Sequence, residues 1–144
     1  KIGLINKGDH LFKNFSMQTY KKKPVFKIYG TNYKTKDGTC IRDFIHVSDI
    51  AEIHSRVLEK INKLNKSKIL NCGYGRGISV KQVAKEFRKY TNKNLKIIEM
   101  PRRKGDLVKI IALNKNLNKF IKWRPKFNNL KIMVKSSLKW EKNQ

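Results

Sequence analysis

The spacing of hydrophobic residues at the start of the chain predicts a helix followed by a strand. Asp9 is placed to cap this helix, and Pro24 prevents the helix from continuing into the strand. The segment from Val25 to Gly30 reads VFKIYG and is typical of a short strand that ends at its glycine. The apolar residues near helical spacing before it are Leu11, Phe12, Phe15 and Tyr20.

A polar segment and a long amphipathic helix follow this strand. Residues 31–38 are polar and end on a glycine, which indicates a loop, and residues 40–47, CIRDFIHV, are expected to be extended. Asp49 and Glu52 stand in the relation of a capping box, so we expect a helix to begin at Asp49. The apolar stripe of this helix consists of Ile50, Ile53, Val57, Leu58, Ile61 and Leu64.

The second half of the chain continues to alternate between strands and helices. Residues 67–77, SKILNCGYGRG, read as a strand that runs into a glycine loop, and Ser79 with Gln82 forms a capping box for the next helix. The alternation predicts the α/β class and one compact unit of 144 residues. The other expected elements are a helix over 80–91, a strand over 94–100, a loop over 101–106, a short apolar segment over 109–113, and helices over 114–121 and 130–140.

The strong positive charge changes the list of partners that must be considered. Lysine and arginine number 35 against 10 acidic residues, a net charge of +25, which on its face indicates nucleic acid or an anionic membrane surface. The charge is mostly lysine and is spread along the chain, with no block longer than Lys21–Lys23. Asparagine and isoleucine are abundant as well, which favours a compositional bias over a nucleic-acid-binding stripe. We therefore expect no nucleic-acid partner, and a basic nucleic-acid-binding domain stays as the alternative.

Neither the cysteines nor the hydropathy pattern indicates a metal site or a membrane. Cys40 and Cys72 are too few for a disulfide framework or a metal site, which favours a reducing cytoplasm. No apolar run approaches the roughly 20 residues of a membrane span, and the first residues do not read as a signal peptide. Because the chain opens on Lys1 rather than on methionine, we expect it to be the middle of a longer protein.

Two features that suggest chemistry have a simpler structural interpretation. Gly73, Gly75 and Gly77 lie between a strand and a helix, but their spacing is not the G-x-G-x-x-G of a dinucleotide-binding turn, so we interpret them as a tight turn. His46 and His54 are candidates for a general base. In an extended strand His46 faces away from the carboxylate three positions before it, and no nucleophile accompanies either histidine, so we interpret both as structural.

The arginines are more informative than the lysines. Arginine occurs seven times against twenty-eight lysines, so Arg42, Arg102 and Arg103, with Asp106 nearby, stand out from a surface rich in lysine. A guanidinium group offers the bidentate geometry that suits a diphosphate. Arg103 and Asp106 are three residues apart in a loop between a proline and a glycine, so they are able to present a cation and an acceptor to one polar ligand. An ordinary surface ion pair explains them equally well.

Several segments together resemble the UDP-glucose 4-epimerases, which are extended short-chain dehydrogenase/reductases. The run from Lys27 to His54, KIYGTNYKTKDGTCIRDFIHVSDIAEIH, is similar to their central signature, and its DGTCIRDFIHV part distinguishes these epimerases from sister enzymes. The segments LNCGYGRGISVKQV, PRRKGD, FIKWRPKF and SLKWEK follow in the same order as in the family. The resemblance covers essentially the whole chain.

This resemblance implies an enzyme that oxidises the C4 hydroxyl of a UDP-hexose with NAD and then reduces the ketone from the other face. It also implies a cytoplasmic homodimer, NAD bound mainly by an N-terminal Rossmann domain, and a base in a Tyr-x-x-x-Lys motif. No tyrosine of this chain has a lysine four positions later. We therefore expect residues 1–144 to be the C-terminal UDP-sugar-binding region, with the Rossmann domain absent, no catalytic residue and no activity alone.

The resemblance also assigns substrate-binding roles to seven residues. His10 and Leu11 match a segment that approaches the uridine diphosphate, and Arg42 matches an arginine that binds the diphosphate. The other four are Lys27 and Tyr29, which match the strand beside the uracil, and Arg103 with Asp106, which match an arginine–aspartate pair that contacts phosphate and ribose.

Two departures from the family pattern affect the expected helix geometry and sugar contacts. Lys13 stands where the family has a proline soon after the His10–Leu11 pair, which affects the helix geometry only. Ile110 stands where some members have a tyrosine that faces the sugar, so the hexose contacts are left open, including those to N-acetylated sugars. Another nucleotide-sugar epimerase or a 4,6-dehydratase is the alternative on the same scaffold.

Overall fold

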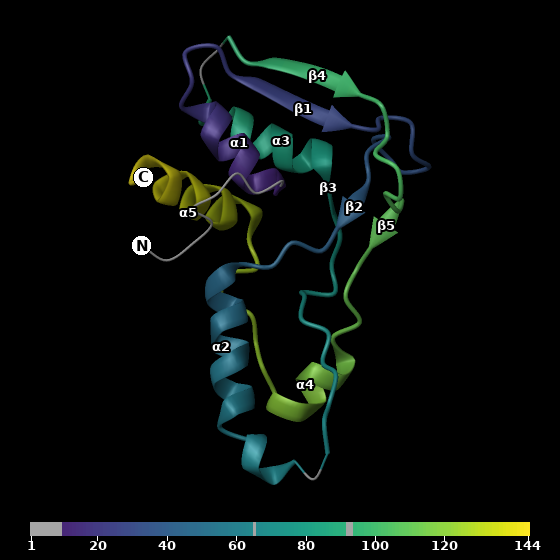
Figure 1. The fold of residues 1–144 in the computed structure, drawn as a ribbon, viewed down its shortest axis with the longest axis vertical. Coiled ribbons are helices and arrows are strands. Elements are labelled where there is room, and N and C mark those ends of the chain that lie inside the picture. Colours follow the sequence, from purple (N-terminus) through teal and green to yellow (C-terminus); the bar gives the residue numbers. More distant parts are fainter. Residues whose placement is uncertain (1–9, 65, 92–93) are drawn as a thin grey trace.

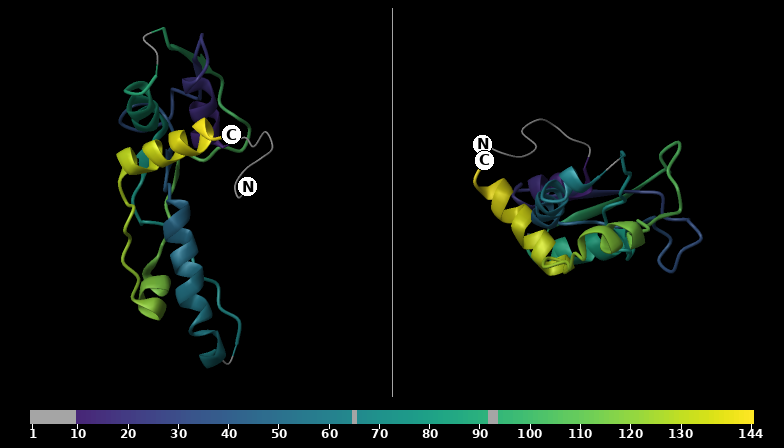
Figure 2. Two further views of the ribbon diagram at one scale, coloured as in Figure 1. Left: turned by 90° about the vertical axis from the view of Figure 1, so that its left-hand side faces the viewer. Right: turned by 90° about the horizontal axis from the view of Figure 1, so that it is seen from below.

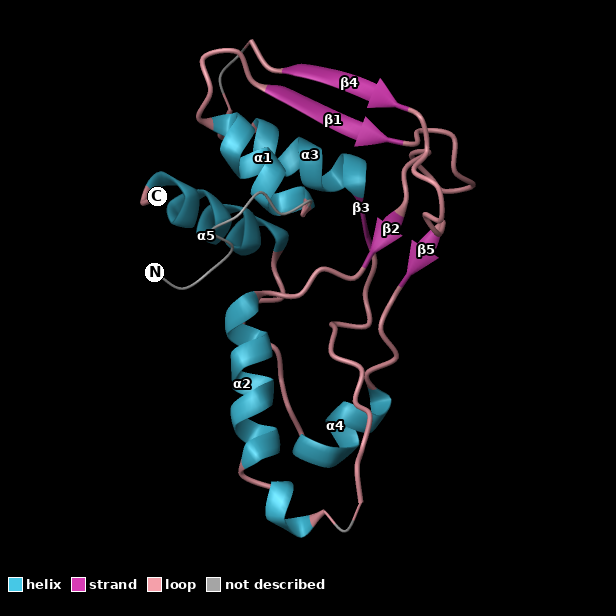
Figure 3. Cartoon of the chain, viewed as in Figure 1, coloured by secondary structure: helices cyan, strands magenta, loops and turns pink. Residues whose placement is uncertain are grey.

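The computed structural model describes residues 10–64, 66–91 and 94–144, and these form an elongated molecule with two parts (Figure 1). The upper part holds a two-stranded sheet covered by three helices, and the lower part holds two helices and a long connecting segment (Figure 3). The elements are α1 (Leu11–Thr19), β1 (Val25–Tyr29), β2 (Ile41–Arg42), α2 (Val47–Leu58), a 3-10 helix (Ile61–Lys63), β3 (Ile78–Ser79), α3 (Val80–Arg88), β4 (Lys96–Met100), β5 (Lys109–Ile110), α4 (Lys115–Ile121) and α5 (Leu130–Lys142). This order of mixed helices and strands confirms the α/β class.

The sheet of the upper part pairs two strands that are far apart in the sequence. β1 and β4 run parallel, with Val25 opposite Lys96 and Tyr29 opposite Met100. Because side chains alternate along a strand, Phe26 and Ile28 face the helices and are fully buried. Figure 2 shows α5, drawn in yellow, beside α1 and α3 under this sheet.

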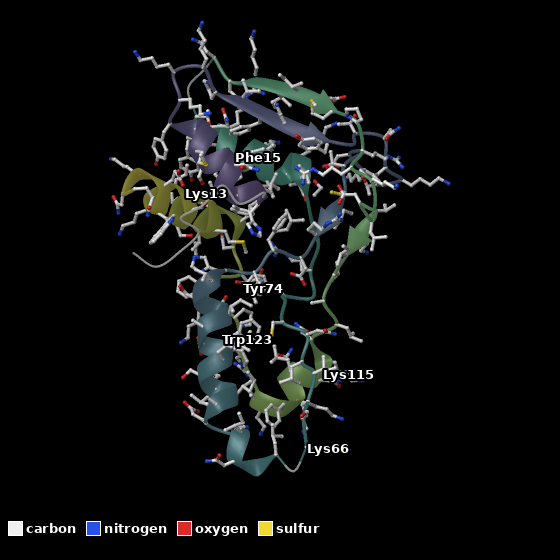
Figure 4. All side chains as sticks on the ribbon, viewed as in Figure 1. Lys13, Phe15, Lys66, Tyr74, Lys115 and Trp123 are labelled. Carbon is white, nitrogen blue, oxygen red and sulfur yellow. The ribbon has the colours of Figure 1, made fainter. Side chains whose placement is uncertain are left out.

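Aromatic rings fill the centre of the upper core. The rings of Phe15 and Phe26 stack with their centroids 4.2 Å apart, and Phe87 meets both edge-on. Such edge-to-face and offset contacts are the favoured geometries of aromatic pairs and add to the hydrophobic stabilisation. Figure 4 shows Phe15 on α1 inside this core. The core fixes α1 and β1, which are the two elements on either side of the site described below.

A small three-stranded sheet connects the two parts of the molecule. β2 pairs antiparallel with β3 and parallel with β5, with Ile41 opposite both Ser79 and Lys109. Each of these strands has two residues. The pairing nevertheless brings the segments around residues 41, 78 and 109 into one layer between the upper and lower parts (Figure 1).

The lower part has its own small core. Ile53, Leu117, Ile121 and Trp123 are buried together there, and the ring of Tyr74 stacks on Trp123 at 6.1 Å between centroids. Figure 4 shows Tyr74 and Trp123 next to each other beside α2.

Most of the expected elements are confirmed. The strand over 25–30 is present as β1, the polar segment 31–38 is a loop, and the strand over 94–100 is present as β4. The capping box of Ser79 and Gln82 is complete, with both hydrogen bonds formed. The expected helices over 114–121 and 130–140 are present as α4 and α5. These predictions succeeded because each rested on a local pattern of hydrophobic residues or caps.

Two expected helix boundaries and one expected strand are wrong. α2 begins at Val47, and its N-cap is His46 rather than Asp49. The same helix ends at Leu58, and only a single 3-10 turn follows, so the apolar stripe runs beyond the helix. Residues 67–72 form no strand ladder within the described residues, because no neighbouring described strand pairs with them. At the first helix, His10 is the N-cap of α1, and Asp9 lies outside the described residues.

Asp49 has a different task from the expected cap. It is fully buried in the first turn of α2 and accepts hydrogen bonds from the backbone N–H groups of Lys126 and Phe127, at 3.1 and 3.0 Å. The phenol of Tyr74 also donates to its carboxylate, at 2.5 Å. Asp49 therefore joins α2 to the segment that leads into α5.

No helix in the described ranges is long and apolar enough to cross a membrane. Over the same part of the chain, no group of three or more histidine, cysteine, aspartate or glutamate side chains is placed to hold a metal ion.

Candidate functional site

A cavity of about 380 Å³ opens between α1, β1, β2 and the loop that follows β4. Its walls combine apolar side chains with three cationic groups and one carboxylate. The lining residues are Leu11, Asn14, Phe15, Gln18, Val25, Lys27, Tyr29, Cys40, Arg42, Phe44, Val80, Arg103 and Asp106. An excess of positive charge around a partly apolar hollow suits an anionic ligand with an apolar or aromatic portion.

The structure brings together six of the seven residues that the resemblance pointed to. Leu11, Lys27, Tyr29, Arg42, Arg103 and Asp106 all line this cavity, although they come from four separate segments. His10 does not line the cavity; it is the exposed N-cap of α1, next to Leu11. The binding roles of all seven residues remain predictions, and the structure adds that six of them share one hollow.

The loop after β4 presents Arg103 and Asp106 from the two ends of one turn. The backbone N–H of Asp106 donates to the carbonyl of Arg103 at 3.2 Å, which closes a four-residue turn. Gly105 has a φ of 85°, the conformation that a type II turn requires at its third residue and that glycine adopts without strain. The glycine between Arg103 and Asp106 therefore allows their side chains to reach the same cavity.

Arg42 is held in place before any ligand binds. Its Nη1 donates to the carbonyls of Ile41 and Leu107 at 2.9 and 2.8 Å, and its Nη2 forms an ion pair with Asp106 at 3.2 Å. The two side chains of this pair are 21% and 29% exposed. Arg42 therefore ties β2 to the loop after β4 and keeps a guanidinium edge at the cavity.

Arg103 lies against an aromatic ring of the same cavity. Its guanidinium carbon is 4.1 Å from the centroid of the Tyr29 ring, within the range of a cation–π contact. Tyr29 belongs to β1 and Arg103 to the loop after β4, so this contact closes the cavity on the strand side. A planar group stacked on a ring has few alternative positions, so the guanidinium group keeps a defined orientation.

Several lining residues were not singled out from the sequence, although two periodicities would have found them. Cys40 and Phe44 lie on the same face as Arg42 at a spacing of two, as expected for an extended segment. Asn14 and Gln18 follow Leu11 at the spacing of one helix face. Burial raises the pKa of the Cys40 thiol above its ordinary value, so this group lines the cavity as a neutral side chain.

Asp37 supports the site by joining the polar loop over 31–38 to the N-terminus of α3. One carboxylate oxygen accepts from the backbone and hydroxyl of Thr39, at 3.0 and 2.8 Å, and the other accepts from the Ser79 hydroxyl. Burial alone would raise the pKa of Asp37, but these hydrogen bonds outweigh burial and leave the pKa below its usual value. Cys40 and Arg42 follow directly on this anchored segment.

The glycine loop over 73–77 does not fit the diphosphate of a dinucleotide. Its backbone N–H groups at Tyr74 and Gly75 already donate to the Asp43 carboxylate, at 3.0 and 2.9 Å. A Cβ on Gly73 would come within 2.6 Å of the same carboxylate and within 2.5 Å of Ala112, so the space beside this glycine is filled by the protein. The interpretation of these glycines as a tight turn agrees with this geometry.

The two histidines examined in the sequence lie away from the cavity. Nδ1 of His46 accepts a hydrogen bond from the Ser48 N–H at 3.1 Å and caps α2, while its other ring nitrogen bonds to the Ser136 hydroxyl at 2.9 Å. His54 is exposed on α2, and its ring bonds to the Ile50 carbonyl. Neither ring is among the groups that line the cavity.

Comparison with known proteins shows the family to which the chain belongs. The sequence pattern of the NAD dependent epimerase/dehydratase family matches residues 5–73. A UDP-glucose 4-epimerase from Azospirillum brasilense is 37% identical over 134 residues, which is 93% of this chain. The chain belongs to the NAD dependent epimerase/dehydratase family.

Solved structures of this epimerase family share the fold. The UDP-Glc/GlcNAc 4-epimerase from Campylobacter jejuni is 39% identical and superposes with a TM-score of 0.81 over 93% of this chain. A UDP-glucose-4-epimerase from Stenotrophomonas maltophila, solved with NAD and formylated UDP-arabinopyranose, is 28% identical with a TM-score of 0.85 over 94% of this chain. The chain spans 38% of the length of the Azospirillum relative and 40% of each of these two solved chains.

Proposed function

We propose that this chain forms the UDP-sugar-binding region of an NAD-dependent UDP-glucose 4-epimerase that interconverts UDP-galactose and UDP-glucose and acts as a homodimer. The proposal rests on one observation: two guanidinium groups, from β2 and from the loop after β4, converge with one carboxylate on a single cavity. Paired arginines are the groups best suited to a diphosphate, and a carboxylate suits a sugar hydroxyl.

The proposed contacts divide the nucleotide into three parts. Arg42 and Arg103 neutralise the diphosphate, and Asp106 accepts a hydrogen bond from a ribose hydroxyl. Lys27 and Tyr29 on β1 lie beside the uracil, with His10 and Leu11 at the start of α1 near the nucleotide. The hydrogen bonds that already hold Arg42 reduce the ordering that binding must impose, which favours affinity.

The chemistry at the sugar is assigned to residues other than those of this chain. NAD supplies hydride acceptance and return in this family, and the glycine loop over 73–77 does not fit its diphosphate. No Tyr-x-x-x-Lys motif is present in the sequence. The proposed contribution of this chain is therefore to bind the nucleotide and to orient the hexose, and we predict no epimerase activity for the chain alone.

Calorimetric titration of the 144-residue chain with UDP tests the binding role. Wild-type chain should bind UDP more tightly than uridine, because only UDP carries the phosphates. Arg103→Ala should weaken UDP binding about tenfold, on the scale of a charge-assisted hydrogen-bonding group, and leave uridine binding unchanged. Lys104→Ala removes the same charge from the same exposed turn and serves as the control. Equal UDP affinity in wild type and Arg103→Ala would overturn the assignment.

The sugar itself is the second question, because related proteins are named for several sugars. A UDP-arabinose 4-epimerase from Arabidopsis thaliana is 39% identical over 83% of this chain, and the Campylobacter enzyme is named for both UDP-Glc and UDP-GlcNAc. Another UDP-sugar 4-epimerase is therefore the second candidate. Product analysis of the complete enzyme with UDP-glucose, UDP-GlcNAc and UDP-arabinose as separate substrates distinguishes the candidates.

A further inference from the structure

Arg102 precedes the proposed phosphate-binding Arg103 but faces a different part of the molecule. It does not line the cavity. Its Nε donates to the side-chain oxygen of Asn32 at 2.7 Å, and its Nη2 donates to the backbone carbonyl of the same residue. Its guanidinium carbon lies 4.1 Å from the centroid of the Tyr33 ring. The Arg102 side chain thus contacts three groups of the polar loop over 31–38: the Asn32 side chain, the Asn32 carbonyl and the Tyr33 ring.

The contact between Arg102 and the loop over 31–38 is packed around Gly30. Gly30 has a φ of 73°, and its N–H donates to the Met100 carbonyl at 2.8 Å. A Cβ here would lie 2.4 Å from the Tyr33 ring and 2.8 Å from Cγ of Arg102. The missing side chain lets the ring and the arginine stem pack directly on the backbone at the end of β1. The loop over 31–38 and the loop after β4 therefore meet at a close-packed joint.

Two consecutive arginines rest on two tyrosines of neighbouring segments. Arg102 stacks on Tyr33, and Arg103 stacks on Tyr29, each at 4.1 Å from the ring centroid. The two arginines stack on rings of different segments, so fixing Arg102 against the loop over 31–38 leaves Arg103 to face Tyr29 and the cavity. The turn that carries Asp106 begins at Arg103, so the same anchor fixes the start of that turn.

We propose that Arg102 is a positioning residue for UDP binding: by clamping the loop after β4 to Asn32 and Tyr33, it holds Arg103 in its binding geometry, while Asp106 is held by its ion pair with Arg42. This inference rests on the proposed UDP-binding function. Arg102 acts through its planar fork and its stacking face, which a lysine does not reproduce. Its own charge is not the operative property, because Arg102 does not line the cavity and two of its five N–H groups donate to the Asn32 carbonyl and side chain.

Titration of the 144-residue chain with UDP distinguishes positioning from charge. Arg102→Ala and Arg102→Lys should each weaken UDP binding about three- to tenfold, because Arg103 keeps its charge but loses the contacts that orient it before UDP binds. Lys104→Ala should bind UDP as wild type does, although it removes one charge from the same turn. Uridine binding should be equal in all four proteins, because uridine has no phosphate for Arg103 to contact.

A double-mutant cycle supplies a readout that a merely structural role would not move. In the Arg103→Ala background, Arg102→Ala should cause no further loss of UDP affinity, because the group that it positions is gone. Thermal unfolding of each variant checks that substitution of the exposed Arg102 leaves the fold intact.

The possible outcomes separate this inference from the function on which it rests. Wild-type affinity in Arg102→Ala, or full affinity in Arg102→Lys, would overturn the positioning role while the Arg103 result still stands. If Arg102→Ala weakened UDP binding by the same factor in the wild-type and the Arg103→Ala backgrounds, the positioning role would be overturned as well. An Arg103→Ala variant that binds UDP as tightly as wild type would instead overturn the proposed function itself.

Discussion

Asp43 holds together segments that are far apart in the sequence. Its two carboxylate oxygens accept hydrogen bonds from the backbone N–H groups of Tyr74, Gly75 and Ala112, at 3.0, 2.9 and 3.2 Å. The backbone N–H groups of the glycine loop therefore donate to a carboxylate of the protein itself, that of Asp43. Asp43 fixes the end of the segment that carries Arg42, so it supports the candidate site without lining it.

Replacing Asp43 by asparagine should destabilise the protein. An amide offers one acceptor oxygen where the carboxylate offers two, so at least one of the three N–H groups loses its partner. These hydrogen bonds are half-buried or exposed, so we expect Asp43→Asn to lower the free energy of unfolding by about 1 kcal/mol, the net contribution of one hydrogen bond. Urea unfolding followed by circular dichroism measures it. Glu59→Gln, at an exposed carboxylate, is the control, and an equal midpoint for both variants would contradict the prediction.

The residues of the site were easier to predict than the residues that support it. Arg103 and Asp106 are three positions apart around a glycine turn, so a local pattern was enough to expect them near one ligand, and both line the cavity. The partners of Asp43 and Asp49 are backbone N–H groups more than thirty residues further along the chain, and no side-chain pattern marks a backbone donor. The carboxylates of Asp43 and Asp49 could be identified in the sequence, but their hydrogen-bond partners could not.

At the scale of elements, α2 begins on a histidine that must be neutral to act as a cap. Nδ1 of His46 accepts from the Ser48 N–H, so the proton of the neutral ring lies on Nε2 and is donated to the Ser136 hydroxyl. That hydroxyl donates in turn to the Met133 carbonyl at 2.9 Å. Protonating Nδ1 would remove the acceptor on which the start of the helix depends.

Stability should therefore fall as the pH falls through the ordinary range of histidine titration. Burial lowers the pKa of His46 below 6.5, and this effect outweighs the nearby Asp49 carboxylate, which acts to raise it. Between the folded pKa and 6.5 the unfolded chain binds more protons than the folded one, so the contribution is present above 6.5 and is lost below it.

Urea midpoints at pH 5, 6, 7 and 8 measure this dependence. His46→Asn keeps an acceptor suited to an N-cap but removes the titrating ring, so its midpoint should change less between pH 5 and pH 7 than that of wild type. The exposed His54→Asn should keep the wild-type dependence. An unchanged slope in His46→Asn would refute the link to this residue.

The two capping boxes in the sequence had opposite outcomes, and the difference is physical. Ser79 and Gln82 satisfy each other's backbone within four residues, so the local pattern determined the start of α3. Asp49 and Glu52 show the same spacing, but Asp49 is drawn into the contact with Lys126 and Phe127, and the cap passes to His46. The strand expected over 67–72 failed for a related reason, because a ladder needs a neighbour that the segment itself does not specify.

At the scale of the whole molecule, a net charge of +25 remains after every acidic residue has been counted. Self-repulsion of this size destabilises a compact state, and dissolved salt screens it over about 10 Å at 0.1 M. We therefore expect the melting temperature to rise when NaCl is increased from 20 mM (about 0.02 M) to about 0.3 M.

A charge-reduced variant provides the control for this salt effect. Lys21, Lys22 and Lys23 are exposed beyond α1, and replacing all three by glutamine lowers the net charge without touching the core. The melting temperature of the triple variant should depend less on salt than that of wild type. Equal salt dependence in the two proteins would show that self-repulsion is not the cause.

The parallel pairing of β1 with β4 determines when the cavity first exists during synthesis. Val25 is opposite Lys96, and the cavity needs residues from Leu11 through to Asp106. Translation proceeds from the N-terminus at about 5–20 residues per second, so β1 waits several seconds for its partner strand. Until then Phe26 and Ile28 lack the completed sheet that they share with β4, and β1 has an unpaired edge. The nucleotide that we propose as the ligand can therefore assist folding only at its last stage, after the loop that carries Arg103 has left the ribosome.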